Sequence, residues 1–334
     1  MDSISHILFG FVLGHALRLD KKERIILIIT CVLPDFDAIS LVNGWEAFFQ
    51  FHRGPLHSFF FAVLASLAIG IVYISLVRVQ QRTFFPVKRF LLIVLICLAG
   101  LFSHLFLDLC TPWTTQVLWP FSNEQITLDL TSFFDPLFLA AIFLASAFIA
   151  YTKNAKKVQM IAIAALLLIA VDFGVRYYEK GAAVQTVKGI YSDTTEVMSV
   201  PTYRPDRWWV VLTTPYENGY MYELYHVDSI HKTIVNSLTM ESSFIHYDGS
   251  AEPPIDSPEE AVAYSKRDEK VKAFIEKSRL PAVDVTFDQG VWHVFWYDAF
   301  SEVDGRVSQG IVADVSTDGT LTVSLSLGDP FNRD

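Results

Sequence analysis

Charged residues and cysteine are both scarce in this chain of 334 residues. Only 19% of the residues are charged and 52% are hydrophobic, which gives a mean hydropathy of +0.35, too apolar for an ordinary soluble protein. Cys31, Cys97 and Cys110 are too few for a disulfide framework and lack paired metal-ligand spacing. The chain also lacks the HExxH motif and the serine-centred G-x-S-x-G elbow, which argues against a zincin peptidase or a serine hydrolase.

The few charges are unevenly distributed between the two halves of the chain. Residues 1–180 contain 12 acidic and 14 basic residues, whereas residues 181–334 contain 24 acidic and 12 basic residues. Neither half offers the basic face that would release counterions from a nucleic acid, so no nucleic-acid partner is expected. The sequence predicts a membrane-embedded domain over residues 1–180 and an acidic domain over residues 181–334.

Six apolar segments in the first half are candidates to cross a bilayer, whose hydrocarbon core needs about 20 helical residues. Four are strong and two, the first two in the chain, are interrupted by histidine or aspartate. The first segment lacks a basic flank and a small-residue cleavage site, so it is not expected to be a cleaved signal peptide. In chain order the segments are Ser3–Leu17, Ile25–Trp45, Ser58–Val77, Phe90–Leu107, Pro136–Thr152 and Val158–Val171, the last continuing to Tyr178.

The positions of Lys and Arg in the short connections predict the orientation of these segments. The connections at residues 18–24, 78–89 and 153–157 carry eleven Lys and Arg residues, whereas those at 35–57 and 108–132 carry only Arg53. Six spans with this bias put both termini outside the cytoplasm. We therefore expect a multi-pass protein of the cell (inner) membrane with an extracytoplasmic C-terminal domain.

The second half has the pattern of a small α+β domain. Five runs rich in Val, Trp, Tyr and Thr predict strands, and Asp318-Gly319 predicts a tight hairpin between the last two. Residues 257–278 predict one helix capped by Ser257. The fold class expected is thus an α-helical polytopic membrane domain followed by a small α+β extracytoplasmic domain. No motif in this domain identifies a protein partner. The predicted strands are Trp208–Thr213, Tyr220–Val227, Val291–Tyr297, Gly310–Val315 and Thr320–Leu325.

Ionisable side chains beside membrane spans are costly, and most of them fall on the predicted outer side. Imidazole and carboxylate groups suit zinc or a similar divalent cation. His104 and Asp108 are four residues apart and share one helix face, while Asp35 and Asp37 repel each other unless a cation joins them. The predicted metal ligands are His6, Asp35, Asp37, His52, His57, His104, Asp108 and Asp135.

Several of these side chains also have simpler interpretations. Asp135 precedes Pro136 and has the features of a helix N-cap. His52 and Arg53 have the ordinary position of interfacial loop residues. Asp172 and Arg176 are four residues apart and are expected to pair with each other. His15 is interpreted as a packed or snorkelling histidine and is left out of the site.

Four motifs resemble the YdjM/DUF457 family of membrane-bound, metal-dependent hydrolases. They are MDSISH at 1–6, LPDFD at 33–37, HRGPLHS at 52–58 and HLFLDLCTPW at 104–113, and the dipeptide at 135–136 also fits. The resemblance covers about residues 1–150. The family is itself similar, more distantly, to zinc-dependent phospholipase C and P1 nuclease. It implies one to three divalent cations, Zn²⁺ foremost. The later HxxxE pair of the phospholipase C pattern is absent from this chain.

The expected chemistry is hydrolysis of a phosphoester by metal-activated water at the outer membrane face. Membrane lipids are the expected partners, and a lipid phosphate is a candidate substrate. Arg53, with its bidentate fork, is predicted to hold the phosphate, and His57 and Asp37 are predicted to be catalytic. A metal-ion transporter or sensor and a catalytically silent scaffold remain as alternatives.

Overall fold

The computed structural model describes residues 1–44, 47–48, 51–81, 87–191, 195–216, 219–243, 251–300 and 310–326. The chain divides into two compact units, each treated separately below. The first comprises Met1–Ile39, Phe51–Gly181 and Pro201–Asp206, and the second comprises Ser40–Gln50, Ala182–Val200 and Arg207–Asp334.

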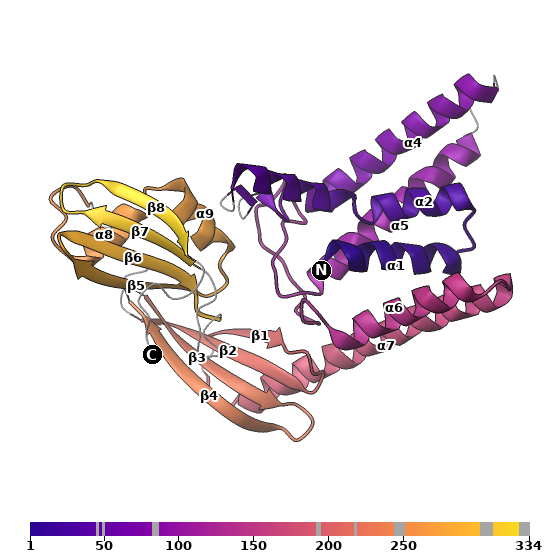
Figure 1. Cartoon of the computed structure of the whole chain (residues 1–334). Coiled ribbons are helices and arrows are strands. Elements are labelled where there is room, and N and C mark those ends of the chain that lie inside the picture. The colour runs from indigo at the N-terminus through magenta and orange to yellow at the C-terminus, as the bar shows by residue number, and fades with distance from the viewer. Residues whose placement is uncertain are drawn as a thin grey trace. The chain divides into compact units, whose positions relative to one another are not determined.

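The first unit is built from helices arranged as antiparallel pairs (Figure 1). A buried cluster that includes Val12, Phe138 and Ile169 joins α1 to the α6–α7 pair, and a second cluster that includes Leu27 and Cys97 joins α2 to α5. The helices are α1 (Ser3–Ala16), α2 (Lys21–Thr30), η1 (Leu33–Asn43), η2 (Pro55–His57), α4 (Phe59–Gln81), α5 (Val87–Leu109), α6 (Pro136–Tyr151) and α7 (Ala155–Val187).

Three of these helices, α4, α5 and α7, are long and apolar enough to cross a membrane, and a fourth span results if α2 and η1 count as one. The expected six full spans are therefore not confirmed. Capping side chains explain the shorter helices: Asp2 caps α1, and Asp20 forms a capping box that starts α2. The segment expected as Ile25–Trp45 is instead divided by a bend of 43° after Thr30; Trp45 lies outside the described residues.

One end of the α6–α7 pair contains a buried ion-pair cluster. Arg176 on α7 contacts Asp172 at 3.0 Å, as expected from their spacing, and also contacts Asp135 at 2.5 Å. Asp135 additionally accepts hydrogen bonds from the backbone N–H groups of Leu137 and Phe138, which confirms its N-cap interpretation.

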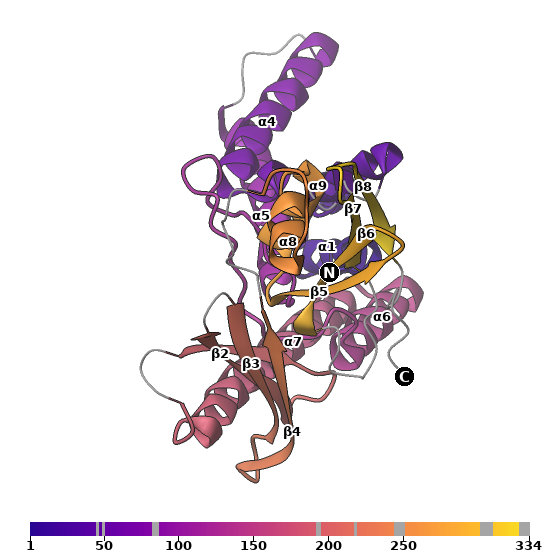
Figure 2. The same cartoon turned by 90° about the vertical axis from the view of Figure 1, so that its left-hand side faces the viewer.

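The second unit contains two four-stranded sheets whose strands follow chain order (Figure 2). The hairpin at Asp318-Gly319 is confirmed, with Gly319 at a φ of +88°. The helix expected over 257–278 is two helices, α8 and α9; Ser257 caps the first and Asp268 starts the second. The strands are β1 (Glu196–Pro201), β2 (Arg207–Tyr216), β3 (Gly219–Asp228), β4 (Thr233–Ser242), β5 (Pro281–Asp288), β6 (Val291–Asp298), β7 (Gly310–Ser316) and β8 (Leu321–Ser326), and the helices are α8 (Pro258–Ser265) and α9 (Glu269–Lys277).

Alternating side chains on the strands give this unit its layers. On β6, Val294 and Trp296 pack against α8 and α9, whereas Phe295 and Tyr297 face the first sheet. The other face of the first sheet packs, through residues that include Trp208, against the last turns of α7. The central strands β2 and β6 are thus buried on two faces, which accounts for their apolar runs.

Candidate metal centre

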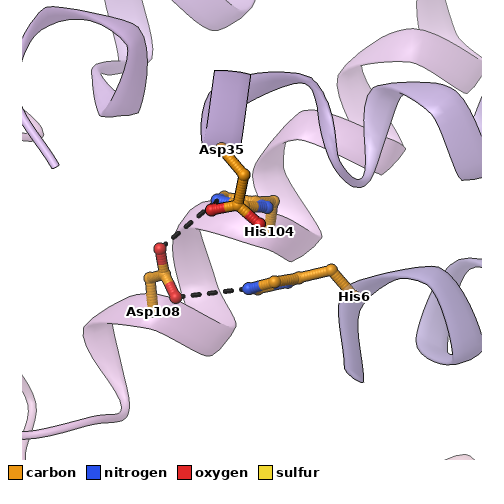
Figure 3. Close-up of side chains that lie close together, drawn as sticks. All are labelled: His6, Asp35, His104 and Asp108. Atoms are coloured by element: carbon orange, nitrogen blue, oxygen red, sulfur yellow. Dashed lines mark hydrogen bonds and ion pairs between the residues drawn. The ribbon is translucent and has the colours of Figure 1, made fainter. Parts of the chain in front are cut away.

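The candidate site lies in the first unit, where four chain segments bring histidine and aspartate side chains together. His6 comes from the first turn of α1, Asp35 from η1, and His104 and Asp108 from the last two turns of α5 (Figure 3). One potential ligand atom from each of these four residues lies within 4.8 Å of the others. His57, at the end of η2, faces the same cluster.

Four donor atoms, from His57, His104, Asp35 and Asp108, lie close enough together to share one cation. The Nε2 atoms of His57 and His104 are 3.1 Å apart, and each lies 3.3 Å from Asp108 Oδ2. Asp35 Oδ1 lies 3.8 Å from His57 Nε2 and 3.6 Å from His104 Nε2. Zinc bonds of about 2.0–2.1 Å to nitrogen and oxygen place tetrahedral ligands roughly 3.3 Å apart. The four atoms therefore suit one small divalent cation.

The protein fixes which ring nitrogen of each histidine faces this point. His104 Nδ1 lies 2.7 Å from the backbone carbonyl oxygen of Cys31, which only a protonated Nδ1 can satisfy. His57 Nδ1 lies 2.9 Å from Asp37 Oδ2. His104 Nε2 is thereby left to present its lone pair to the cluster, the arrangement by which carbonyls orient metal-bound histidines. His57 also has Nε2 toward the cluster, but its contact with Asp37 lacks hydrogen-bond geometry.

The two oxygens of Asp108 have very different surroundings. Oδ1 accepts a hydrogen bond from Arg53 Nη2 at 2.9 Å, lies 3.3 Å from His6 Nε2 and also contacts the Met1 amino group. Oδ2 is buried and accepts no hydrogen bond from any residue in the described part of the chain. A buried carboxylate oxygen facing only two imidazole nitrogens is costly unless a cation or proton lies between them.

The local charges balance when His57 is protonated. Asp35, Asp37 and Asp108 supply three carboxylates, and the Arg53 guanidinium, the Met1 amino group and a protonated His57 supply three positive charges. Burial acts to lower the pKa of His57, but its contacts with the three carboxylates outweigh burial and raise the pKa to about 10. Without a metal His57 therefore holds a proton at neutral pH, and a bound divalent cation would displace that proton.

Arg53 differs from the expected phosphate clamp because its guanidinium is buried and used within the protein. Nη1 donates to the Thr111 hydroxyl at 2.9 Å and to the Trp113 carbonyl at 2.6 Å, while Nη2 binds Asp108. The Arg53 backbone N–H also donates to Asp37 Oδ2 at 3.1 Å, from a left-handed conformation with φ of 57°. Arg53 thus ties Asp37 to Asp108 and does not offer its fork to a substrate.

The remaining predicted ligands lie around the centre or away from it. His52 Nδ1 lies 2.7 Å from Asp37 Oδ1, so His52 and Asp37 form an outer layer behind His57. The His6 ring stacks on that of His104 at 3.9 Å. Asp135 is not among the residues that the structure brings together here, because its carboxylate caps α6 and binds Arg176.

Sequence reasoning missed several groups that shape the centre. The Cys31 carbonyl became available because α2 ends there, and the Ser3 hydroxyl donates to Asp35 Oδ2 at 2.6 Å. Backbone carbonyls have no signal in a sequence. Thr111 and Trp113 did have a signal in the sequence, because both lie in the motif HLFLDLCTPW that begins at His104.

Fold and site together define a helical membrane protein with a candidate divalent-metal group at one end of its helices. The chain belongs to the YdjM inner membrane protein family, whose model matches residues 1–183, and this confirms the expected family. The chain is also similar to the uncharacterized protein YfhP of Bacillus subtilis (strain 168), with 24% identity over 229 residues. The match covers 64% of this chain and 65% of that relative's length. No solved structure matches the chain.

Replacing Asp108 by Asn should abolish stoichiometric metal binding, because the amide removes the negative charge that Oδ2 presents to the two histidines. We expect an affinity loss of at least about 100-fold. Metal content of the detergent-purified protein measures this. The matched control is Asp314→Asn, which alters another His–Asp pair, that of His293 and Asp314 at 2.6 Å, in the second unit. Equal metal content in both variants and the parent would exclude a metal centre at Asp108.

Replacing Arg53 by Lys should weaken metal binding by about 10–100-fold, because one ammonium cannot hold Asp108, Thr111 and Trp113 together. Competition with a chelator measures the affinity, and Arg207→Lys, which alters the Arg207–Asp228 pair at 2.9 Å, is the control. Parent-like affinity with loss of catalysis alone would instead favour the original phosphate-clamp interpretation.

Proposed function

We propose that this protein is a membrane-bound, metal-dependent hydrolase that cleaves a phosphoester with Zn²⁺ as the first-choice cation. The observation that carries the proposal is the buried, unbonded Asp108 Oδ2 facing the Nε2 atoms of His57 and His104. A donor set of two imidazoles and two carboxylates suits zinc and related divalent ions. Such an ion lowers the pKa of bound water toward 7 and polarises a phosphoryl oxygen.

We propose that three of the four ligand residues are held rigidly and that the fourth, Asp35, borders an open side of the centre. His57, His104 and Asp108 are fully buried and closely spaced, whereas Asp35 is slightly exposed and its Oδ1 lies farther from both histidines. We place the water molecule or phosphoryl oxygen, which a catalytic site needs in addition to its protein ligands, beside Asp35 as the least enclosed of the four.

In this proposal the attacking water gives up its proton to solvent as the new P–O bond forms, while Asp35 serves as a ligand, with Oδ1 toward the histidines and Oδ2 accepting from the Ser3 hydroxyl. The bond from phosphorus to the ester oxygen breaks, and the departing alkoxide takes a proton from solvent. Asp37 acts through His57, since its carboxylate holds the imidazole with Nε2 toward the centre. Arg53 likewise acts through Asp108 and Asp37 and is a positioning residue.

Hydrolysis should be detectable with p-nitrophenyl phosphate and with phosphatidic acid in mixed micelles, and chelation should abolish it. Asp37→Asn should lower turnover by about 10–100-fold while most of the metal is retained at saturating zinc, because the amide holds His57 less firmly. Metal content and steady-state rates are measured on the same samples. Failure of the zinc-loaded parent to cleave either ester would overturn the hydrolase proposal. Zinc uptake into proteoliposomes would then favour a transporter, and its absence a scaffold.

We also propose that the site and the second unit lie outside the cytoplasm in the cell (inner) membrane. The proposal rests on the eleven-to-one distribution of Lys and Arg between the two sets of connections. It is consistent with the helical pairs in Figure 1, in which the α1–α2 and α6–α7 turns lie at the helix ends opposite those that carry His6 and Asp135. The proposal keeps the topology of six membrane-crossing segments. In it, α1, α6 and the bent α2–η1 pair are the three segments that are shorter than a regular span or bent.

A topology reporter fused after residue 185 should be active outside the cytoplasm, and one inserted at residue 84, outside the described residues, should be active inside. Alkaline phosphatase and a fluorescent protein serve as the two complementary reporters. The opposite pair of results would reverse the proposed sidedness.

A further inference from the structure

The segment that carries Asp35 is an eleven-residue 3₁₀ helix, η1, with three separate rows of side chains. A 3₁₀ helix has three residues per turn, so residues three apart lie on one row. Pro34 and Asp37 are buried at the start of one row, whose later members Ser40 and Asn43 are more exposed. Asp35 lies on a second row, turned toward the metal centre. The third row begins with the partly buried Leu33 and continues with Phe36, Ile39 and Val42.

The third row is apolar and strongly exposed. Phe36, Ile39 and Val42 are 63%, 73% and 84% exposed, respectively. Three large apolar side chains in one row on a short helix are unfavourable in water, since each exposes area that would be stabilised by an apolar environment. The helix is thus amphipathic in an unusual sense, with its carboxylates turned inward and its apolar row turned outward.

The position of the metal centre along the helices indicates what covers this row. The candidate span of α4 begins at Phe59, two residues after His57, and the span of α5 ends at Leu109, one residue after Asp108. The centre therefore lies at the level where the hydrocarbon core meets the headgroups. Phe60 at the start of α4 contacts Trp119, and tryptophan side chains favour this level of a bilayer.

We propose that the apolar row of η1 lies in the lipid at the headgroup–acyl boundary, and that the centre takes its phosphoester from a membrane lipid arriving in the plane of the bilayer. The substrate part of this inference rests on the proposed hydrolase function. The placement of η1 in lipid does not rest on that function, and its test requires no measurement of activity. Continuity with the adjacent spans favours lipid over a second copy or a protein partner as the occupant.

The placement is tested with a nitroxide label on Ile39→Cys in proteoliposomes of phosphatidylethanolamine and phosphatidylglycerol. The native Cys31, Cys97 and Cys110 are buried, so labelling of the folded protein selects the introduced thiol. Leu95→Cys on the α5 span and Val235→Cys on β4, both exposed, calibrate hydrocarbon and water. We expect residue 39 to lie about 5–10 Å into the boundary region, accessible to oxygen more than to a polar nickel reagent.

Two results would overturn the placement. Nickel accessibility at residue 39 equal to that at residue 235 would put the row in water. Immobilisation of the label without lipid accessibility would show that a second copy or another protein covers the row.

The substrate class is tested with Phe36→Ser/Ile39→Ser. We expect KM for phosphatidic acid in mixed micelles to rise by at least about tenfold. The kcat/KM for p-nitrophenyl phosphate and the metal content should be unchanged, as in the control Val235→Ser. A parent protein that cleaves only the soluble ester, or a double variant with parent-like KM for the lipid, would overturn the lipid substrate. Cleavage of neither ester would overturn the proposed hydrolase function and the substrate class with it, while the label at residue 39 still decides the placement.

Discussion

The ion pair between Arg53 and Asp108 is the interaction on which the centre depends. Asp108 is buried at the end of a membrane span, where an isolated carboxylate is strongly disfavoured. Arg53 compensates this charge through Oδ1 only, so Oδ2 remains directed at His57 and His104. The left-handed backbone at Arg53, which costs about 1–3 kcal/mol for a residue with a side chain, lets one residue reach Asp108 and Asp37 together.

Helix ends and helix breaks supply nearly every group of the centre. The break after Thr30 frees the Cys31 carbonyl for His104 and redirects the chain into η1 with Asp35. A straight helix through this region would use that carbonyl in its own hydrogen-bond ladder. The short, capped helices that depart from a regular bundle are therefore the features that position the ligands.

Much of this arrangement followed from local sequence patterns. The i, i+4 spacing of His104 and Asp108 and the apolar length of α4, α5 and α7 are visible in the sequence because helical periodicity and span length are local properties. The partners of Arg53 are not local, since they lie 55 to 60 residues away and two of them are backbone carbonyls. Sequence reasoning consequently identified Arg53 as important but could not predict the contacts that its guanidinium makes within the protein.

The second unit also contains elements that sequence reasoning did not predict, for a different physical reason. Strand β4 was missed because nearly all its side chains are exposed, so its sequence lacks the alternation of a half-buried strand. The helix over 257–278 was expected to be continuous, because nothing in the sequence distinguishes Asp268 from other polar residues. In the structure the Asp268 carboxylate accepts a hydrogen bond from the Lys270 backbone N–H and so starts a second helix. Capping and burial are decided by tertiary context, which composition alone does not report.

The contacts behind the histidines bear on how the candidate centre could hold an ion. The Cys31 carbonyl fixes His104, Asp37 lies against His57, and Arg53 holds Asp108. Three candidate ligands are thereby preorganised before any ion binds, which lowers the cost of ordering them. Asp35 is the least enclosed ligand, and it lies on the helix whose opposite row is apolar. In the proposed hydrolase, this least enclosed side is the one on which a substrate would enter.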